Sequence, residues 1–264
     1  MVQRILSVWI WVTTVVVGIL LLFVLMAAFA LTAWRDPGRY AVGRWFRRGA
    51  MAAVALNPLW SFRTSGFRPD DPRRPYVAVS NHESLADIFL ISHLPWEMKW
   101  LSKDAIFKIP VMGWMMRMAG DIPVARSVRS SRAQAIEECR DRLHRRVSVM
   151  IFPEGTRSRT GALLPFKDGA FRLAIEEGVP ILPMAVAGTR SAMRTESLLF
   201  GRARAEVRVL EPVSTDHLTI GDLPKLRDGV RALIQAERDK LVQELELNPD
   251  GSIQNASESA VPTV

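Results

Sequence analysis

Two short loops of this sequence carry the residues best suited to chemistry, and the first contains a histidine and an aspartate. In residues 80–87 (SNHESLAD), Asp87 follows His82 by five positions. A carboxylate on one ring nitrogen of a histidine fixes the tautomer, stabilises the imidazolium and leaves the other nitrogen free as a base. We expect His82 on a loop and Asp87 in the first turn of the next helix. The alternative is a capping loop in which Ser84 caps that helix and His82 has no chemical role.

The second loop, residues 152–159 (FPEGTRSR), combines a glycine with charged side chains. Gly155 allows a close backbone approach, and Arg157 offers a planar fork that suits phosphate. Glu154 can accept from hydroxyl groups or hold the arginine, and Thr156 lies between these residues. A solvated charged turn is the alternative interpretation.

Two further cations, Lys103 and Arg126, follow apolar segments in the same way and are weaker candidates for phosphate contacts. The sequence lacks the nucleophile elbow G-x-S-x-G, the phosphate loop G-x-x-x-x-G-K-[ST] and the dinucleotide motif G-x-G-x-x-G. Its single cysteine, Cys139, excludes a disulfide framework and a cysteine-cluster metal site. We therefore expect neither a metal nor a bound cofactor.

The elements that must position these residues alternate between short apolar strands and helical patterns. Strands are expected at 76–80, 98–102, 121–125, 147–152, 181–188 and 205–213, and helices at 84–94, 111–118, 130–146, 169–177 and 223–247. This alternation predicts an α/β fold with a mixed, partly parallel sheet flanked by helices. Open sheets of this kind place their sites at the carboxyl ends of strands, where both loops would lie.

The amino-terminal region indicates a membrane anchor. Residues 5–34 contain no charged side chain, although about 20 apolar residues suffice to span a bilayer. A second apolar stretch, residues 49–60, is too short to span and contains Pro58. We expect a membrane-inserted helical hairpin within residues 1–60, either crossing the bilayer or dipping into one leaflet. The arginines between Arg35 and Arg48 place the following domain on the cytoplasmic face of the cell membrane.

Composition and charge indicate the class of binding partner and the division of the chain into segments. The 35 Lys and Arg residues exceed the 27 Asp and Glu residues, giving a net charge of +8. Many of the aromatic residues lie in apolar runs rather than among arginines, which favours anionic lipid over nucleic acid as the partner. Residues 61–75 are expected to form a linker, residues 76–247 the main domain and residues 248–264 a disordered tail.

Together these motifs resemble the glycerolipid acyltransferase family, and within it the 1-acyl-sn-glycerol-3-phosphate (lysophosphatidate) acyltransferases. Residues 81–87 (NHESLAD) look like the family's block N-H-x-[SQ]-x-x-D, and residues 152–158 (FPEGTRS) look like its block F-P-E-G-T-R-S. Residues 120–126 and 179–184 resemble its second and fourth blocks. The resemblance covers about residues 76–215. It implies that His82 is a general base, that Asp87 orients it, and that Lys103, Arg126, Glu154, Gly155, Thr156 and Arg157 form the substrate-binding site.

The resemblance further implies direct acyl transfer from acyl-CoA or acyl-carrier protein to the sn-2 hydroxyl of lysophosphatidate, which yields phosphatidate. Backbone N–H groups near Ser84 are the expected oxyanion donors. Other acceptors, namely another lysophospholipid or an acylated amino acid, would use the same chemistry. A non-catalytic basic membrane-binding protein and a lipid hydrolase are rivals of different classes. The paired motifs argue against the first, and the missing serine elbow argues against the second.

Overall fold

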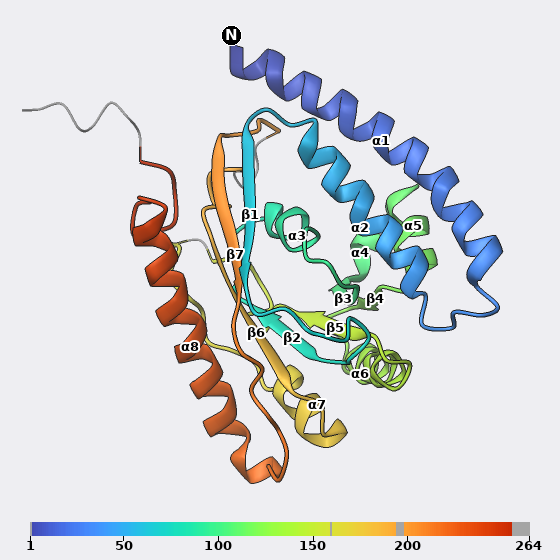
Figure 1. The fold of residues 1–264 in the computed structure, drawn as a ribbon, viewed down its shortest axis with the longest axis vertical. Helices are drawn as coiled ribbons and strands as arrows, with labels where there is room; N and C mark the ends of the chain where they lie inside the picture. Colours follow the sequence, from blue (N-terminus) through green and yellow to red (C-terminus); the bar gives the residue numbers. More distant parts are fainter. Residues whose placement is uncertain (1, 159, 194–197, 255–264) are drawn as a thin grey trace, which may run out of the picture.

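A seven-stranded sheet forms the centre of the protein, whose computed structural model describes residues 2–158, 160–193 and 198–254 (Figure 1). The strands are β1 (Trp60–Gly66), β2 (Val77–Ser80), β3 (Met98–Lys103), β4 (Ile122–Val124), β5 (Ser148–Ile151), β6 (Ile181–Ala187) and β7 (Ala203–Val209). They lie in the order β1-β7-β6-β2-β5-β3-β4. Every neighbouring pair is parallel except β6 and β7. The predicted mixed, partly parallel α/β sheet is therefore confirmed.

Helices cover both faces of this sheet. They are α1 (Val2–Thr32), α2 (Tyr40–Ala55), α3 (Ala86–Ile91), α4 (Asp104–Phe107), α5 (Met112–Ala119), α6 (Arg129–His144), α7 (Gly169–Glu177), the 3-10 helix η1 (Ile220–Asp222) and α8 (Leu223–Glu244). One apolar core joins α6, α7 and α8 to one face of the sheet, and a second core joins α3 to the other face. All residues of β2 and β6 are buried, as expected for strands in the interior of a sheet covered on both faces.

Strand β1 corrects the first part of the linker predicted at residues 61–75, namely residues 61–66. Trp60–Gly66 pairs in parallel with Ala203–Val209 at one edge of the sheet. Ser65 contributes a cross-strand contact, since its hydroxyl donates to Glu206 Oε1 over 2.5 Å and accepts from Arg208 Nε over 3.1 Å. The polar sequence SFRTSG lacks a continuous apolar pattern because it forms an edge strand with alternating exposure. The sheet-bearing part of the chain thus begins near Trp60.

Helix α1 is the one helix, in the part of the chain that the structure describes, that is long and apolar enough to cross a membrane. It lies alongside α2, and both pack against α5 (Figure 1). Leu25, Val42 and Met115 are the buried centre of this contact. The expected hairpin of two inserted segments is therefore corrected. Helix α2 includes Arg44, Arg47 and Arg48, and it buries Arg47 together with apolar residues such as Val42 and Val54.

A buried network of charges holds the side of α2 that carries Arg47. The Arg47 guanidinium lies 2.5 Å from Asp121 Oδ1 and 3.7 Å from Glu97 Oε1, and Lys99 Nζ lies 3.0 Å from Glu97 Oε1. All four side chains are at least nine-tenths buried. Gly43 makes room for them, because a Cβ there would lie 2.1 Å from Glu97 Oε1. Two cations and two anions thus fix α2 to β3 and to the residue before β4.

The residues after α8 correct the prediction of a disordered tail. Leu247 and Ile253 form an antiparallel bridge, and the Gly251 N–H donates to the Asn248 carbonyl over 2.8 Å. Residues 247–253, here called the C-terminal loop, therefore fold back on the domain. The remainder of the expected tail, residues 255–264, lies outside the described residues.

Candidate active site

Five parallel strands bring the predicted site residues to one edge of the sheet. The order is β6-β2-β5-β3-β4, all five strands end at this edge, and the last four each have a predicted site residue at or after their end. His82 follows β2, and Glu154 follows β5. Lys103 ends β3, and Arg126 lies just beyond β4. Crossovers through helices return each strand in the same direction, so residues far apart in sequence meet here.

His82 and Asp87 form a hydrogen-bonded pair at the centre of this edge. His82 Nδ1 lies 2.7 Å from Asp87 Oδ2. The pair is sheltered, since 15% of the His82 side chain and none of the Asp87 side chain is exposed. Because a carboxylate only accepts, Nδ1 carries the hydrogen, and Nε2 is left with a lone pair. The pair therefore has the arrangement that a histidine base requires.

The Asp87 carboxylate is held by the backbone and by a residue that the sequence analysis missed. Oδ2 also accepts from the N–H of Glu83 over 2.8 Å and of Ser84 over 3.0 Å. Oδ1 accepts from the hydroxyl of Thr189. Thr189 follows the buried strand β6 at the same sheet edge. A polar residue directly after an apolar strand is the sequence pattern that could have identified it. The N–H groups of Glu83 and Ser84 are committed to Asp87, which corrects their expected role as oxyanion donors.

Phe152 and Asn81 position the His82 loop. The Phe152 ring stacks on the imidazole, with centroids 4.0 Å apart and an angle of 16° between the planes. The Asn81 side chain donates to the Val186 carbonyl and accepts from the Val186 N–H, both over 2.8 Å. Neither contact was predicted, because each depends on which strands are neighbours.

Glu154 lies after β5 as predicted, but its hydrogen-bond partners are backbone N–H groups. Its Oε1 accepts from the His82 N–H over 2.7 Å, and its Oε2 accepts from the Leu164 N–H over 2.9 Å. Burial raises the pKa of this carboxyl, while the two backbone donors oppose that rise. Glu154 therefore joins the His82 loop to Leu164, and each carboxylate oxygen keeps a second lone pair for a further donor. The substrate-binding role of Glu154 stays a prediction.

Basic side chains gather around Gly155, next to the histidine loop. Arg126 donates to the Gly155 carbonyl. Gly155 has φ +71°, and a Cβ there would lie 2.6 Å from Lys167 Nζ, so the lysine amine sits against this backbone. Thr156 and Arg157 follow on the same loop with exposed side chains. This cluster of positive charge suits a phosphate group.

Lys103 lies further along the same edge. It is exposed at the end of β3 and pairs in register with Val124, two residues before Arg126. The structure therefore brings Lys103 to the basic side of the site, whereas no described contact joins Lys103, Thr156 or Arg157 to His82.

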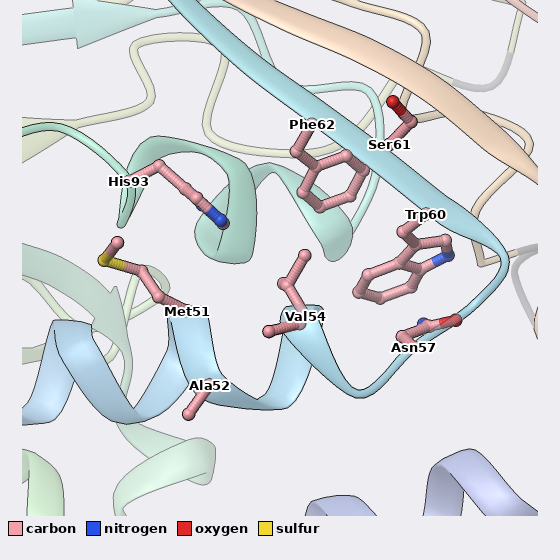
Figure 2. A pocket seen from close by; sticks show the side chains of 9 residues that line it. Met51, Ala52, Val54, Asn57, Trp60, Ser61, Phe62 and His93 are labelled. Carbon is pink, nitrogen blue, oxygen red and sulfur yellow. The ribbon is translucent and has the colours of Figure 1, made fainter.

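An open groove of about 530 Å³ lies between α2, β1 and the residues after α3. Figure 2 shows Trp60 and Phe62 along one side and Met51 and Val54 along another, with His93 at one end. His93 Nδ1 is 2.8 Å from the Phe89 carbonyl and donates to it. The lining is mainly apolar, and neither member of the His82–Asp87 pair belongs to it.

The remaining candidate groups are the possible metal ligands and the single cysteine. In the part of the chain that the structure describes, no group of three or more His, Cys, Asp or Glu side chains is placed to hold a metal ion. Cys139 lies on the buried face of α6, and burial raises its pKa to about 12. Its thiol therefore stays protonated and packs as a small apolar side chain.

Comparison with known proteins agrees with the motifs. The family model described as "Acyltransferase" matches residues 63–187. A chloroplastic 1-acyl-sn-glycerol-3-phosphate acyltransferase of Brassica napus is 44% identical over 147 residues, which are 55% of this chain and 43% of that protein. The 1-acyl-sn-glycerol-3-phosphate acyltransferase of Saccharomyces cerevisiae is 32% identical over 177 residues, 66% of this chain and 56% of that protein. This chain thus covers less than two thirds of the length of either relative.

The fold also has a solved counterpart. The crystal structure of PlsC, the 1-acyl-sn-glycerophosphate (LPA) acyltransferase from Thermotoga maritima, superposes with a TM-score of 0.72 at 25% sequence identity. The match covers 90% of this chain and 95% of that one.

Proposed function

Because residues 63–187 belong to the acyltransferase family, we propose that this chain transfers a fatty acyl group from acyl-CoA or acyl-carrier protein to the sn-2 hydroxyl of lysophosphatidate, forming phosphatidate. The observation that carries the proposal is the pair His82 and Asp87, with Nε2 left as a base beside a cluster of positive charge. A base next to a phosphate-binding surface suits an acceptor that has a hydroxyl near a phosphate.

The reaction proceeds in two steps without a covalent enzyme intermediate. His82 Nε2 takes the proton of the acceptor hydroxyl while its oxygen attacks the thioester carbonyl carbon. The tetrahedral intermediate then collapses, the carbon–sulfur bond breaks, and the imidazolium returns the proton to the leaving thiolate. Asp87 stabilises the imidazolium between these steps, and general base catalysis of this kind contributes about 10²- to 10⁴-fold.

The basic residues around Gly155 fix the acceptor. Arg126 and Lys167 approach the same backbone turn, and Arg157 and Lys103 extend the positive surface toward solvent. A phosphate bound there would leave the neighbouring hydroxyl within the reach of His82. Positioning of both substrates supplies much of the remaining rate enhancement.

Helix α1 would hold this site at a membrane by lying along its surface. Near its start, Gln3 Nε2 donates to the Phe200 carbonyl over 3.1 Å, and Ser7 Oγ accepts from the Phe200 N–H over 3.0 Å. Near its other end, Leu25 packs on α2 and α5. At 1.5 Å per residue the helix is about 46 Å long, and contacts at both ends with one domain favour an in-plane orientation over a crossing. Its apolar outer face would enter one leaflet of the cell membrane, with the domain on the cytoplasmic face.

Release of free thiol by the purified protein tests the proposed activity. With an acyl thioester donor, thiol should appear only when lysophosphatidate is added, and phosphatidate should form in equal amount. A panel of other lysolipids and acylated amino acids identifies the acceptor. Thiol release that is independent of any acceptor would indicate a hydrolase, and no release with any acceptor would indicate a binding protein.

Cysteine labelling tests the orientation of α1. Val2→Cys and Trp34→Cys each replace an exposed residue near one end of the apolar segment, while the native Cys139 is buried. In sealed inverted vesicles, a membrane-impermeant maleimide should label both variants. Protection of one of the two would show that α1 crosses the bilayer.

A further inference from the structure

The C-terminal loop, residues 247–253, contacts two of the segments that build the site. The Asp250 carboxylate lies 3.1 Å from Arg190 Nε, and the Ile253 N–H donates to Ser191 Oγ over 2.9 Å. These contacts reach the residues directly after Thr189. The Asp250 carbonyl also lies against Gly161, where an added Cβ would be 2.3 Å from it. The loop therefore contacts the residues after Thr189, whose hydroxyl binds Asp87, and it also contacts the segment that follows Arg157.

The same loop covers a buried ion pair beneath the catalytic loop. Glu83, the residue after His82, lies with its Oε1 2.7 Å from Arg238 Nε of α8. At most 3% of either side chain is exposed. Gly251 lies over the pair with φ +83°, and a Cβ there would be 3.1 Å from both Glu83 Oε2 and Arg238 Nη2. Only glycine leaves this pair undisturbed.

Glu83 is connected directly to the catalytic pair. It is adjacent to His82 in the chain, and its N–H donates to Asp87 Oδ2 over 2.8 Å. A shift of Glu83 would therefore move both members of the pair. Burial raises the pKa of Glu83 to about 8, although the Arg238 guanidinium opposes that rise. Both the neutral and the ionised carboxyl accept the hydrogen of Arg238 Nε, so the contact does not depend on the charge of Glu83.

We infer that Glu83 and Arg238, covered by Gly251 of the C-terminal loop, are positioning residues that set the geometry of His82 and Asp87. They touch no reacting atom. The inference rests on the proposed acyl transfer, in which a misplaced base slows the chemical step. Displacement of reacting groups by about 1 Å can lower a rate by up to about a hundredfold.

Gly251→Ala tests the inference, with Gly178→Ala as its matched control. Gly178 ends α7 with φ +61° and would meet no atom within 4 Å. Both substitutions strain a left-handed backbone, but only Gly251→Ala places a Cβ against the Glu83–Arg238 pair. Because the added Cβ requires the pair to shift by only a few tenths of an ångström, Gly251→Ala should lower kcat by about three- to tenfold with the KM of each substrate unchanged. Gly178→Ala should keep the wild-type kcat.

Arg238 provides a second comparison. Arg238→Met removes the donor to Glu83, whereas Arg238→Lys keeps a positive charge and a donor at the same place. The lysine variant should recover a substantial part of the kcat that the methionine variant loses. Equal losses in the two variants, or a change in KM alone, would contradict a positioning role.

Amide hydrogen exchange makes the inference testable without turnover. The N–H groups of Glu83 and Ser84, which bond to Asp87, should exchange about tenfold faster in Gly251→Ala than in Gly178→Ala. Unchanged exchange and unchanged kcat in Gly251→Ala would overturn the inference while the wild-type activity stands. An inactive wild-type protein would instead overturn the proposed function.

Discussion

Thr189 donates its hydroxyl hydrogen to Asp87 Oδ1 across 102 positions of sequence. The other carboxylate oxygen, Oδ2, holds His82 Nδ1 and two backbone N–H groups. Asp87 is fully buried, so each oxygen needs these partners. The orientation of the imidazole is therefore fixed jointly by the turn after β2 and by the residues after β6.

Removal of the Thr189 hydroxyl should slow the reaction. Thr189→Val keeps the volume but leaves a buried carboxylate oxygen without its donor, at a cost of about 1–3 kcal/mol. We expect kcat to fall about tenfold, whereas Thr189→Ser should stay near wild type. Steady-state kinetics with both substrates measures the effect, and a valine variant with the wild-type kcat would contradict it.

Loss of the base should abolish turnover. His82→Ala should lower kcat by about 10²- to 10⁴-fold, and Asp87→Asn should be severely impaired because the ring loses its orienting acceptor. His144→Ala is the control, since that histidine is 70% exposed and pairs with Glu177 on the surface. Substantial activity in a folded His82→Ala variant would exclude the proposed mechanism.

Arg157→Ala should weaken the use of lysophosphatidate more than that of the acyl donor. A charge-assisted contact to phosphate contributes about 1.5–3 kcal/mol, so the KM for the acceptor should rise roughly tenfold to a hundredfold. Lys103→Ala should change the same constant in the same direction. Arg172→Ala, on the exposed surface of α7, is the control. A KM effect limited to the donor would reassign Arg157 to the phosphates of the donor.

The buried charges under α2 should make Arg47 important for stability. Arg47→Met leaves Asp121 and Glu97 without one of their cations, and breaking a buried pair in this way costs about 3–5 kcal/mol. The neighbouring Arg48 is exposed and lies over the Trp45 ring, so Arg48→Met should change stability by less than about 0.5 kcal/mol. Unfolding in detergent compares the two variants, and similar midpoints would disprove the role of the network.

The pH dependence of stability should reflect Glu83. Its pKa is raised by burial from 4.5 to about 8 in the folded protein, so the folded state keeps a proton that the unfolded chain has released. This contribution is fully present below pH 4.5 and is lost as the pH rises through about 8. Glu83→Gln should therefore lose less stability than wild type between pH 6 and pH 9. Parallel pH profiles of the unfolding midpoint for the two proteins would contradict this.

The sequence by itself determined the strands and helices that have strong local patterns. The expected helix at 169–177 coincides with α7, and the expected strand at 181–188 differs from β6 by one residue. It also placed His82 and Glu154 after apolar strands at one sheet edge, since a polar motif directly after an apolar strand marks that edge. These features are local, because the spacing of apolar residues reports which side of an element is buried.

Only the tertiary structure decided the contacts that join distant segments. Strand β1 is polar and exists because β7, far along the chain, pairs with it. Glu154 carries a charge that suggested substrate binding, but its neighbours in space are two backbone N–H groups. Thr189 and Gly251 have ordinary local patterns, and their importance comes from Asp87 and from the Glu83–Arg238 pair. The free energy of such contacts depends on which strands and helices become neighbours, and no local window of sequence contains that information.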